Sequence, residues 1–178
     1  ENGEPLKFFD AVVGGLSVGT PGTPRLLEDA HRRWGRANWA GLFDDAITLA
    51  EDGFPVSPRL AGLVERDADR LQRFAATAAY FFPDGVGLAA GDTLMNPDYA
   101  DTLRALADHG ADAFYSGPIA QDIVTTVRTA PGNPGVLSTD DLELYQVIER
   151  NAVCAEYRAH EVCGIGPPSS GGLTVGQI

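Results

Sequence analysis

Lysine is almost absent from this sequence: Lys7 is the only one in 178 residues. With the arginines it gives 13 basic residues against 25 acidic ones, a formal net charge of -12. Proteins that bind nucleic acid or anionic membrane surfaces gather Lys and Arg to meet the phosphates. The composition therefore argues against nucleic acid and anionic lipid as partners.

Long apolar runs are also missing. No stretch approaches the roughly 20 apolar residues of a membrane helix, so we expect no membrane span in this segment. The chain opens "ENGEPLKFFD", without an initiator Met, a basic region or an apolar leader. Its last residues, "GGLTVGQI", look like the first turn of a longer helix. We expect residues 1–178 to form a single, incomplete domain of a longer protein.

What is present suits a packed, mainly helical domain, since 44% of the residues are hydrophobic and 21% are charged. Helices with cap and stop residues are predicted over 23–35, 38–53, 57–74, 96–110, 117–132 and 138–145. Their expected caps are Thr23, Asn38, Ser57, Asn96 and Ser138. The expected buried stripes are Leu26, Leu27, Ala30 and Trp34 in one helix and Leu42, Phe43, Ala46, Leu49 and Ala50 in the next.

Strand patterns lie near both ends. Val12–Val18 is β-branched and glycine-rich, which predicts a strand followed by a turn at Thr20–Gly22, whereas residues 75–91 are irregular. Residues 145–166 are rich in Val, Ile, Tyr and Cys with partial alternation, which indicates two or three strands. The order of strand, many helices and then strands predicts an α+β fold with the helices segregated from the sheet.

The most unusual stretch is "GIGPPSSGG", residues 164–172. It lacks the lysine of a phosphate-binding P-loop and the third glycine of a dinucleotide fingerprint. It also does not match the Gly-x-Ser-x-Gly turn that carries a serine nucleophile. We interpret it as a backbone device in which the prolines stiffen an extended exit from the last strand and Ser169 or Ser170 caps the next helix.

The three histidines supply no obvious base for these serines. His31 lies beside Arg32 and Arg33 on an expected solvent face, and His109 ends a helix, where a charged imidazole favours the helix dipole. His160 falls at an expected hairpin turn.

Cys154 and Cys163 are nine positions apart and lack the spacing of a zinc site. A two-residue loop at 158–159 would place them opposite each other as a non-hydrogen-bonded pair, where a disulfide could form. Against this, Glu156 would face Glu161, and Arg-Ala is a poor hairpin turn. The sequence leaves both states open and favours two free, buried thiols as the commoner outcome.

The acidic clusters are expected to be surface or first-turn charges, because adjacent helical residues do not share a face. These clusters are Asp44 with Asp45, Asp140 with Asp141, and Glu65 with Asp67 and Asp69. No self-sufficient active site is predicted: we expect no catalytic, cofactor-binding or metal-binding residue in this chain, and no cofactor.

Several stretches in order resemble the γ-glutamyltranspeptidase family. They are "SVGTPGT", "NWAGLFDDAITLAEDGFPVS", "GDTLMNPDYADTLRALADHGADAFYSGPIAQDIV", "STDDLELYQVIER", "YRAHEV" and "GPPSSGG". The resemblance runs from about Gly14 to Ile178 and is most specific in "LAEDGFPVS" and "PPSSGG". It is to the middle and latter part of the family's large subunit.

The resemblance implies an N-terminal-nucleophile hydrolase with an αββα sandwich and no cofactor. A precursor cleaves itself, and the new N-terminal threonine of the small subunit attacks a γ-glutamyl amide such as glutathione. The α-amine of that threonine acts as its own base. The threonine, the oxyanion glycines and the arginine that holds the substrate carboxylate all lie outside this chain. The implied partner is therefore a small subunit carrying the nucleophile, and the implied location is periplasmic or extracellular.

Two other readings remain open: a cephalosporin-type acylase of the same group, and a non-catalytic helical binding domain. The strands in 147–178 carry apolar residues on both faces in places, which suits a sheet covered on both sides. We therefore predict that this segment borders the missing subunit and is the least stable part of the chain.

Overall fold

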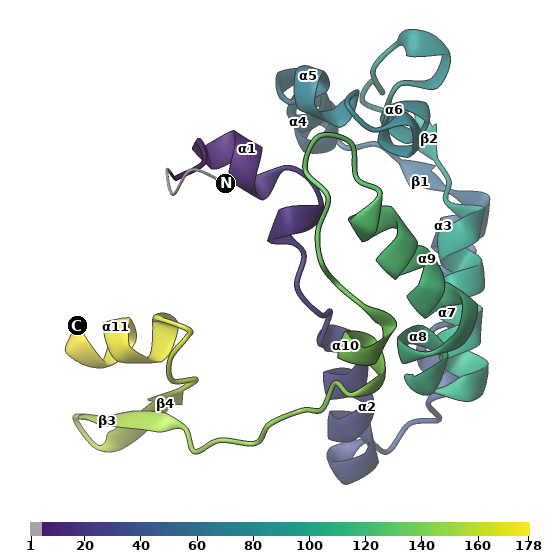
Figure 1. Ribbon diagram of the computed structural model, residues 1–178. Coiled ribbons are helices and arrows are strands. Elements are labelled where there is room, and N and C mark those ends of the chain that lie inside the picture. The colour runs from purple at the N-terminus through teal and green to yellow at the C-terminus, as the bar shows by residue number, and fades with distance from the viewer. Residues whose placement is uncertain (1–4) are drawn as a thin grey trace. The chain divides into compact units, whose positions relative to one another are not determined.

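The computed structural model describes residues 5–178 and divides the chain into two compact units. The first unit extends to Gln146, and the C-terminal unit is Val147–Ile178 (Figure 1). The first unit is mainly helical with one two-residue strand pair, and the C-terminal unit is a β-hairpin followed by one helix. The longer strands thus follow the helices along the chain, which confirms the α+β class.

The first unit is a succession of short helices joined by turns and by longer loops, such as the one between α9 and α10 (Figure 1). Its helices are α1 (Phe8–Val12), η1 (Gly15–Ser17), α2 (Thr23–Trp34), η2 (Ala40–Leu42), α3 (Asp44–Asp52), α4 (Pro58–Arg66), α5 (Ala68–Leu71), α6 (Ala75–Phe81), η3 (Pro83–Gly85), α7 (Pro97–His109), α8 (Asp112–Tyr115), α9 (Gly117–Arg128) and α10 (Thr139–Glu143).

Most of the predicted helix caps are confirmed. The Ser57 hydroxyl accepts from the Leu60 N–H at 3.1 Å and begins α4. The Asn96 side chain accepts from the Tyr99 N–H at 3.0 Å and begins α7. Ser138 forms a reciprocal capping box with Asp141 at α10.

Thr23 does not act as a cap, because α2 already includes it and Gly22, in the helical region, precedes it. Asn38 accepts from the Gly41 N–H at 3.1 Å, but it begins the short helix η2 rather than one continuous helix. The helix α3 then starts at Asp44 and ends at Gly53, whose φ of 84° suits glycine. Residues expected to be irregular contain the helix α6.

The strand predicted over Val12–Val18 is wrong. The helix α1 ends at Val12, and η1 follows after Gly14, whose φ is 126°. The Gly15 N–H donates to the Asn133 carbonyl at 2.7 Å, and a Cβ on Gly15 would lie 2.2 Å from the Val127 carbonyl oxygen. These glycines serve a close approach of two backbones, and among the described residues no strand pairs with this segment.

A two-residue antiparallel pair that the sequence did not indicate joins the ends of two helical segments. The strand β1 (Phe54–Pro55) pairs with β2 (Thr93–Leu94). The pair continues at Val56, whose N–H donates to the Asp92 carbonyl at 2.8 Å. It brings α3 and α7 side by side.

Two apolar clusters form the core of the first unit. One consists of Ala111, Tyr115, Ala120 and Leu142, packed against Phe114, Ile123, Val124 and Tyr145. The other consists of Val56, Leu88 and Leu94, packed against Leu60, Ala61, Tyr80 and Phe81. The first cluster joins α8, α9 and α10, and the second joins α4, α6 and β2.

The two predicted buried stripes are only partly right. Leu26, Leu27 and Trp34 of α2 are exposed, and 73% of the Trp34 surface is accessible to solvent. In α3, Ala50 is buried, whereas Leu42, Ala46 and Leu49 are exposed. These faces have no cover among the described residues, and α2 instead turns Arg25 and Glu28 toward α8.

In the C-terminal unit, β3 (Val153–Tyr157) and β4 (His160–Gly164) form an antiparallel hairpin, and α11 (Gly171–Gln177) follows. The predicted register is confirmed, with Tyr157 opposite His160 and Cys154 opposite Cys163. Two strands form, within the predicted two or three.

Candidate functional site

The segment "GIGPPSSGG" joins β4 to α11 through close glycine contacts. A Cβ on Gly164 would lie 2.8 Å from the Gly172 Cα, and one on Gly172 would lie 2.6 Å from the Ile165 carbonyl oxygen. Any larger residue at either position would therefore push the end of the strand away from the start of the helix. This supports the interpretation of the segment as a backbone device.

Two details of that interpretation are wrong. Pro167 and Pro168, joined by a cis peptide bond, form a turn rather than an extended exit. Ser170 is the residue before α11, but its side chain makes no cap hydrogen bond. Its φ of -83° and ψ of -16° are helical, whereas a capping side chain needs an extended backbone to reach the next turn.

Of the three histidines, only His160 lies in the same compact unit as Ser169 and Ser170, and no described hydrogen bond within that unit joins it to either serine. His31 is half-buried rather than on a solvent face: its Nε2 lies 2.9 Å from the Ala37 carbonyl oxygen, and its ring lies edge-on to Trp39. His109 ends α7, as predicted, and His160 begins β4 directly after the hairpin turn; both are exposed.

The prediction of two free, buried thiols is wrong. Cys154 and Cys163 form a disulfide, and both are exposed. Their Cα atoms lie 4.1 Å apart, close to the separation of a non-hydrogen-bonded pair. The hairpin forms in the register that pairs the two cysteines, despite the two unfavourable features, the Glu156–Glu161 pair and the Arg-Ala turn. The sulfur atoms are bonded to each other and so are not thiolate ligands for a metal.

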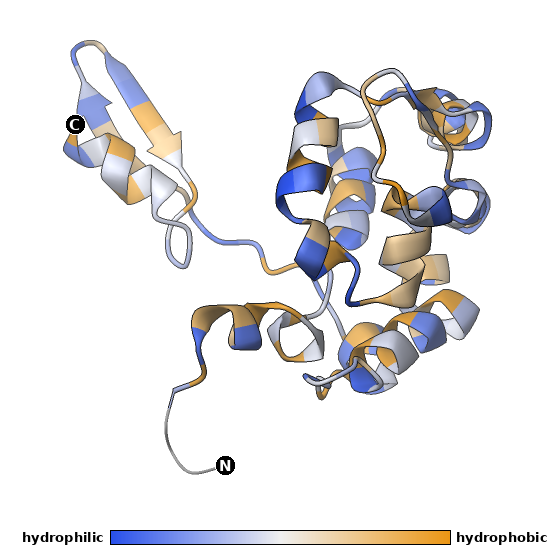
Figure 2. Cartoon of the chain, turned by 90° about the horizontal axis from the view of Figure 1, so that it is seen from above, coloured by the Kyte–Doolittle hydropathy of each residue, from blue (hydrophilic) through white to orange (hydrophobic). Residues whose placement is uncertain are grey.

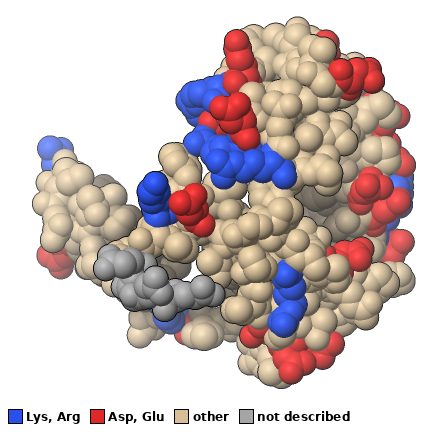
Figure 3. Space-filling model, turned by 45° about the horizontal axis from the view of Figure 1, so that its top comes forward, with Lys and Arg blue, Asp and Glu red and all other residues tan. Residues whose placement is uncertain are grey.

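The acidic clusters hold structural positions. Asp44 and Asp45 lie in the first turn of α3, and Asp67 pairs with Arg70. The Ser138 hydroxyl and backbone N–H hold the pKa of Asp141 below its ordinary value, because both stabilise the charged carboxylate. On the face drawn in Figure 3, most basic side chains lie beside acidic ones.

A hollow of about 570 Å³ lies beside α4. Its lining residues include Pro58, Ala61, Phe82 and Leu88, and Glu65 is the one ionisable side chain among them. A single carboxylate without a nucleophile or a second acid does not make a hydrolytic site.

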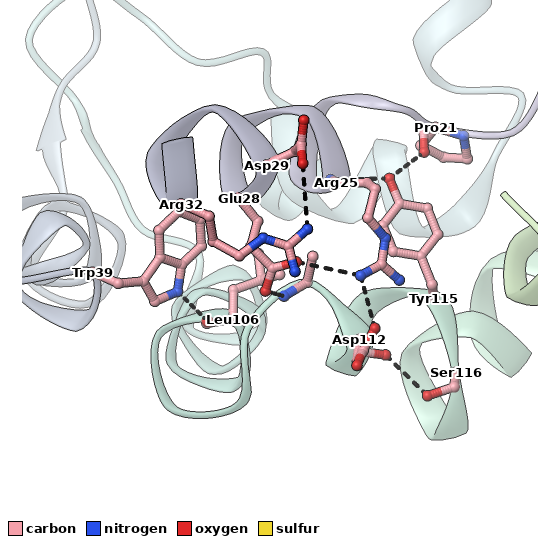
Figure 4. A network of polar contacts seen from close by, with 11 residues as sticks. Pro21, Arg25, Glu28, Asp29, Arg32, Trp39, Leu106, Asp112, Tyr115 and Ser116 are labelled. Atoms are coloured by element: carbon pink, nitrogen blue, oxygen red, sulfur yellow. Dashed lines mark hydrogen bonds and ion pairs between the residues drawn. The ribbon is translucent and has the colours of Figure 1, made fainter. Parts of the chain in front are cut away.

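A network of polar contacts in the first unit ties α2 to α8 (Figure 4). The Arg25 guanidinium lies 2.7 Å from Asp112 and 3.3 Å from Glu28. The second oxygen of Glu28 accepts from the Ala111 N–H at 3.0 Å, at the start of α8. Burial alone would lower the pKa of Arg25, but Asp112 and Glu28 outweigh it and raise that pKa.

Tyr115 completes this cluster from within the core. Its hydroxyl donates to the Pro21 carbonyl at 2.6 Å and accepts from the Arg25 N–H at 3.3 Å. Its ring stacks on Tyr145, and the Arg25 guanidinium lies 4.7 Å from the ring centroid. Burial raises the pKa of Tyr115, so the phenol stays protonated and keeps donating. The cluster holds the fold together and presents no free nucleophile or base.

Asn133 is a second residue that the sequence did not single out. It is buried in the loop between α9 and α10, and its amide donates to the carbonyls of Asp10 at 2.6 Å and Val13 at 3.1 Å. It thereby ties the end of α1 to a loop more than a hundred residues away. Periodicity and cap patterns are local, so they carry no signal for such a contact.

No described helix has both the length and the apolar character needed to cross a membrane.

Comparisons with known proteins identify the family of this chain. The family model for Gamma-glutamyltranspeptidase matches residues 1–178. The chain is 35% identical over 178 residues to the Glutathione hydrolase proenzyme of Bacillus subtilis strain 168, which covers 100% of this chain and 30% of that protein. It is 34% identical over 167 residues to the Acylase ACY 1 proenzyme of a Pseudomonas species, covering 94% of this chain and 29% of that protein.

The crystal structure of Helicobacter pylori gamma-glutamyltranspeptidase superposes with a TM-score of 0.91 at 30% identity. The match covers 98% of this chain and 50% of that one. It confirms the fold implied by the sequence resemblance, that of an N-terminal-nucleophile hydrolase. The chain spans about 30% of the length of the curated relatives named above. With the family model matching its full length, the chain belongs to the γ-glutamyltranspeptidase family of enzymes.

Proposed function

We propose that the protein to which this chain belongs cleaves γ-glutamyl amides such as glutathione and passes the γ-glutamyl group to water or an amino acid. The observation that carries the proposal is the family match over all 178 residues. The relative from Bacillus subtilis is named a glutathione hydrolase proenzyme, which supports both the substrate and a self-cleaving precursor.

The chain itself contributes the scaffold of that enzyme. In this proposal, the hydroxyl of an N-terminal threonine in a small subunit attacks the γ-carbonyl, the amine leaves, and the acyl-enzyme is then resolved by the acceptor. The described residues offer structural ion pairs, caps and close glycine contacts. The two compact units would then be parts of one larger domain, and the chain alone would be inactive.

A cephalosporin-type acylase is the second candidate. Its support is the 34% identity to the Acylase ACY 1 proenzyme. That identity is within a percentage point of the value for the glutathione hydrolase, so this segment alone does not favour the acylase. The third candidate, a non-catalytic binding domain, is not supported, because the matched family consists of enzymes.

A segment exchange tests the proposal. The matching segment of the Bacillus subtilis proenzyme is replaced by this chain, and the chimera is assayed for self-cleavage and for release of chromophore from a γ-glutamyl anilide. We expect both activities, and we expect them to persist in a chimera with Ser170→Ala. A folded chimera that neither cleaves itself nor turns over the anilide would contradict the proposal. Because the host supplies the threonine and the substrate arginine, the chimera tests the scaffold role. The two candidates are separated by the same two substrates on the whole protein to which this chain belongs: hydrolysis of a cephalosporin side-chain amide but not of the anilide would support the acylase.

A further inference from the structure

The hairpin of the C-terminal unit has two unlike faces. Successive residues of a strand point to opposite sides, so Cys154 shares a face with Glu156, and Cys163 shares the same face with Glu161. All four residues are exposed. The opposite face meets α11, where a Cβ on Gly176 would lie 3.2 Å from the Ala155 Cβ. Figure 2 shows α11 alongside the hairpin.

We propose that the Cys154–Cys163 disulfide is a thiol-exchange site for low-molecular-weight thiols. A thiolate attacks one sulfur, and the other cysteine leaves as a thiolate, which gives a mixed disulfide. A second thiol attacks the mixed disulfide, releases the oxidised small molecule and leaves two reduced cysteines. Two electrons pass from two thiols to the protein. In the 178-residue chain both cysteines are exposed, which gives the attacking thiol the access that this reaction needs.

The rest of the hairpin is poorly suited to hold its register without the bond. Glu156 lies directly opposite Glu161, a like-charge pair that is unfavourable. Arg158 in the turn has a φ of 56°, a conformation that non-glycine residues seldom adopt. The sheet has two strands only, and an isolated hairpin is marginally stable in water. Reduction is therefore expected to loosen β3 and β4.

The loosening should reach α11. The end of β4 touches the start of α11 through Gly164 and Gly172, and Ala155 packs under Gly176. A hairpin that shifts or opens removes the surface on which this helix rests. The thiol-exchange site thus controls the order of the whole C-terminal unit, while the first unit has its own cores.

The two glutamates should also make the site selective for the charge of the thiol. A carboxylate oxygen of Glu161 and both sulfur atoms all lie within 4.8 Å of one another. A unit charge about 5 Å away in water changes the local concentration of a charged reactant about fourfold at low ionic strength. The nearby cation, Arg158, lies over the ring of Tyr157 at the tip of the hairpin. Thiols that carry an ammonium group should therefore react faster, per thiolate, than thiols that carry a sulfonate.

The test uses the 178-residue chain with three thiols whose attacking thiolates differ in charge: zwitterionic cysteamine, singly negative mercaptoethanol and doubly negative mercaptoethanesulfonate. Mass spectrometry follows the mixed disulfide and the reduced protein, and each rate constant is expressed per thiolate. We expect reduction of the folded chain and a rate ratio of cysteamine to mercaptoethanesulfonate of at least about fourfold at low salt. The ratio should fall toward one in the variant with Glu156→Gln and Glu161→Gln.

The matched control, Asp44→Asn with Asp45→Asn, removes two carboxylates from the first unit and should leave the ratio unchanged. Hydrogen exchange of the reduced chain should quicken in β3, β4 and α11 but not in α7. A disulfide that is reduced only after denaturation would overturn the proposal. A preference for ammonium-bearing thiols that persists in the Glu156→Gln and Glu161→Gln variant would also overturn it. The same holds if reduction leaves the hydrogen-exchange rate of α11 unchanged.

Discussion

Replacing Tyr115 by phenylalanine removes one hydroxyl from the centre of the first unit. The Tyr115 side chain is 1% exposed, and its hydroxyl links two backbone groups at the start of α2, the Pro21 carbonyl and the Arg25 N–H. Leaving a buried polar group without its partner costs about 1–3 kcal/mol. Because the ring and its stacking on Tyr145 remain, we expect a loss of about 2 kcal/mol in the free energy of unfolding.

Urea unfolding followed by tryptophan fluorescence measures this loss, since Trp34 and Trp39 both lie in the first unit. A urea dependence of about 1–3 kcal/mol per molar converts the loss into a midpoint shift of roughly 1 M. The control is Tyr99→Phe, because Tyr99 is 53% exposed, and its midpoint should not move. If Tyr115→Phe shifts the midpoint no more than this control does, the hydroxyl does not tie α2 to α8 and the reasoning is wrong.

Three further outcomes are expected. Leu142→Ala, at a side chain with 0% exposure, should lower the free energy of unfolding by about 2–5 kcal/mol, whereas Leu144→Ala, at 76% exposure, should change it little in the same urea experiment. Asp141→Asn should destabilise the first unit at neutral pH, because the lowered pKa of Asp141 contributes stability that is fully present above the unfolded value of about 4 and is lost as pH falls through the folded pKa. Its difference from the parent chain should therefore vanish in acid melts below that folded pKa. The raised pKa of Tyr115 stabilises below its unfolded value of about 10, so alkaline melts should show stability falling as pH rises through the folded pKa, a fall that Tyr115→Phe reduces.

Local chemistry explains what the sequence could predict. Ser57, Asn96 and Ser138 cap helices because each side chain reaches a backbone N–H only three residues away. The hairpin register follows from a two-residue loop and the alternation of side chains.

The sequence could not predict which elements pack together, because those contacts join residues that are far apart in the chain. The amphipathic pattern of α2 gives the direction of its apolar face but not which neighbour covers it. In the structure, its polar residues Arg25 and Glu28 meet α8, while Leu26 and Leu27 stay exposed. The bonds of Tyr115 to Pro21 and of Asn133 to Asp10 span 94 and 123 positions, beyond the reach of any local pattern.

In the proposed function, this chain supplies scaffold and no reacting group to a γ-glutamyl-transferring enzyme. This is tested by the release of chromophore from a γ-glutamyl anilide by the purified 178-residue chain, beside a buffer blank and the Ser170→Ala variant. We expect the chain, the variant and the blank to give the same rate. Turnover by the chain above the blank, abolished by Ser170→Ala, would contradict this expectation and would make Ser170 a nucleophile.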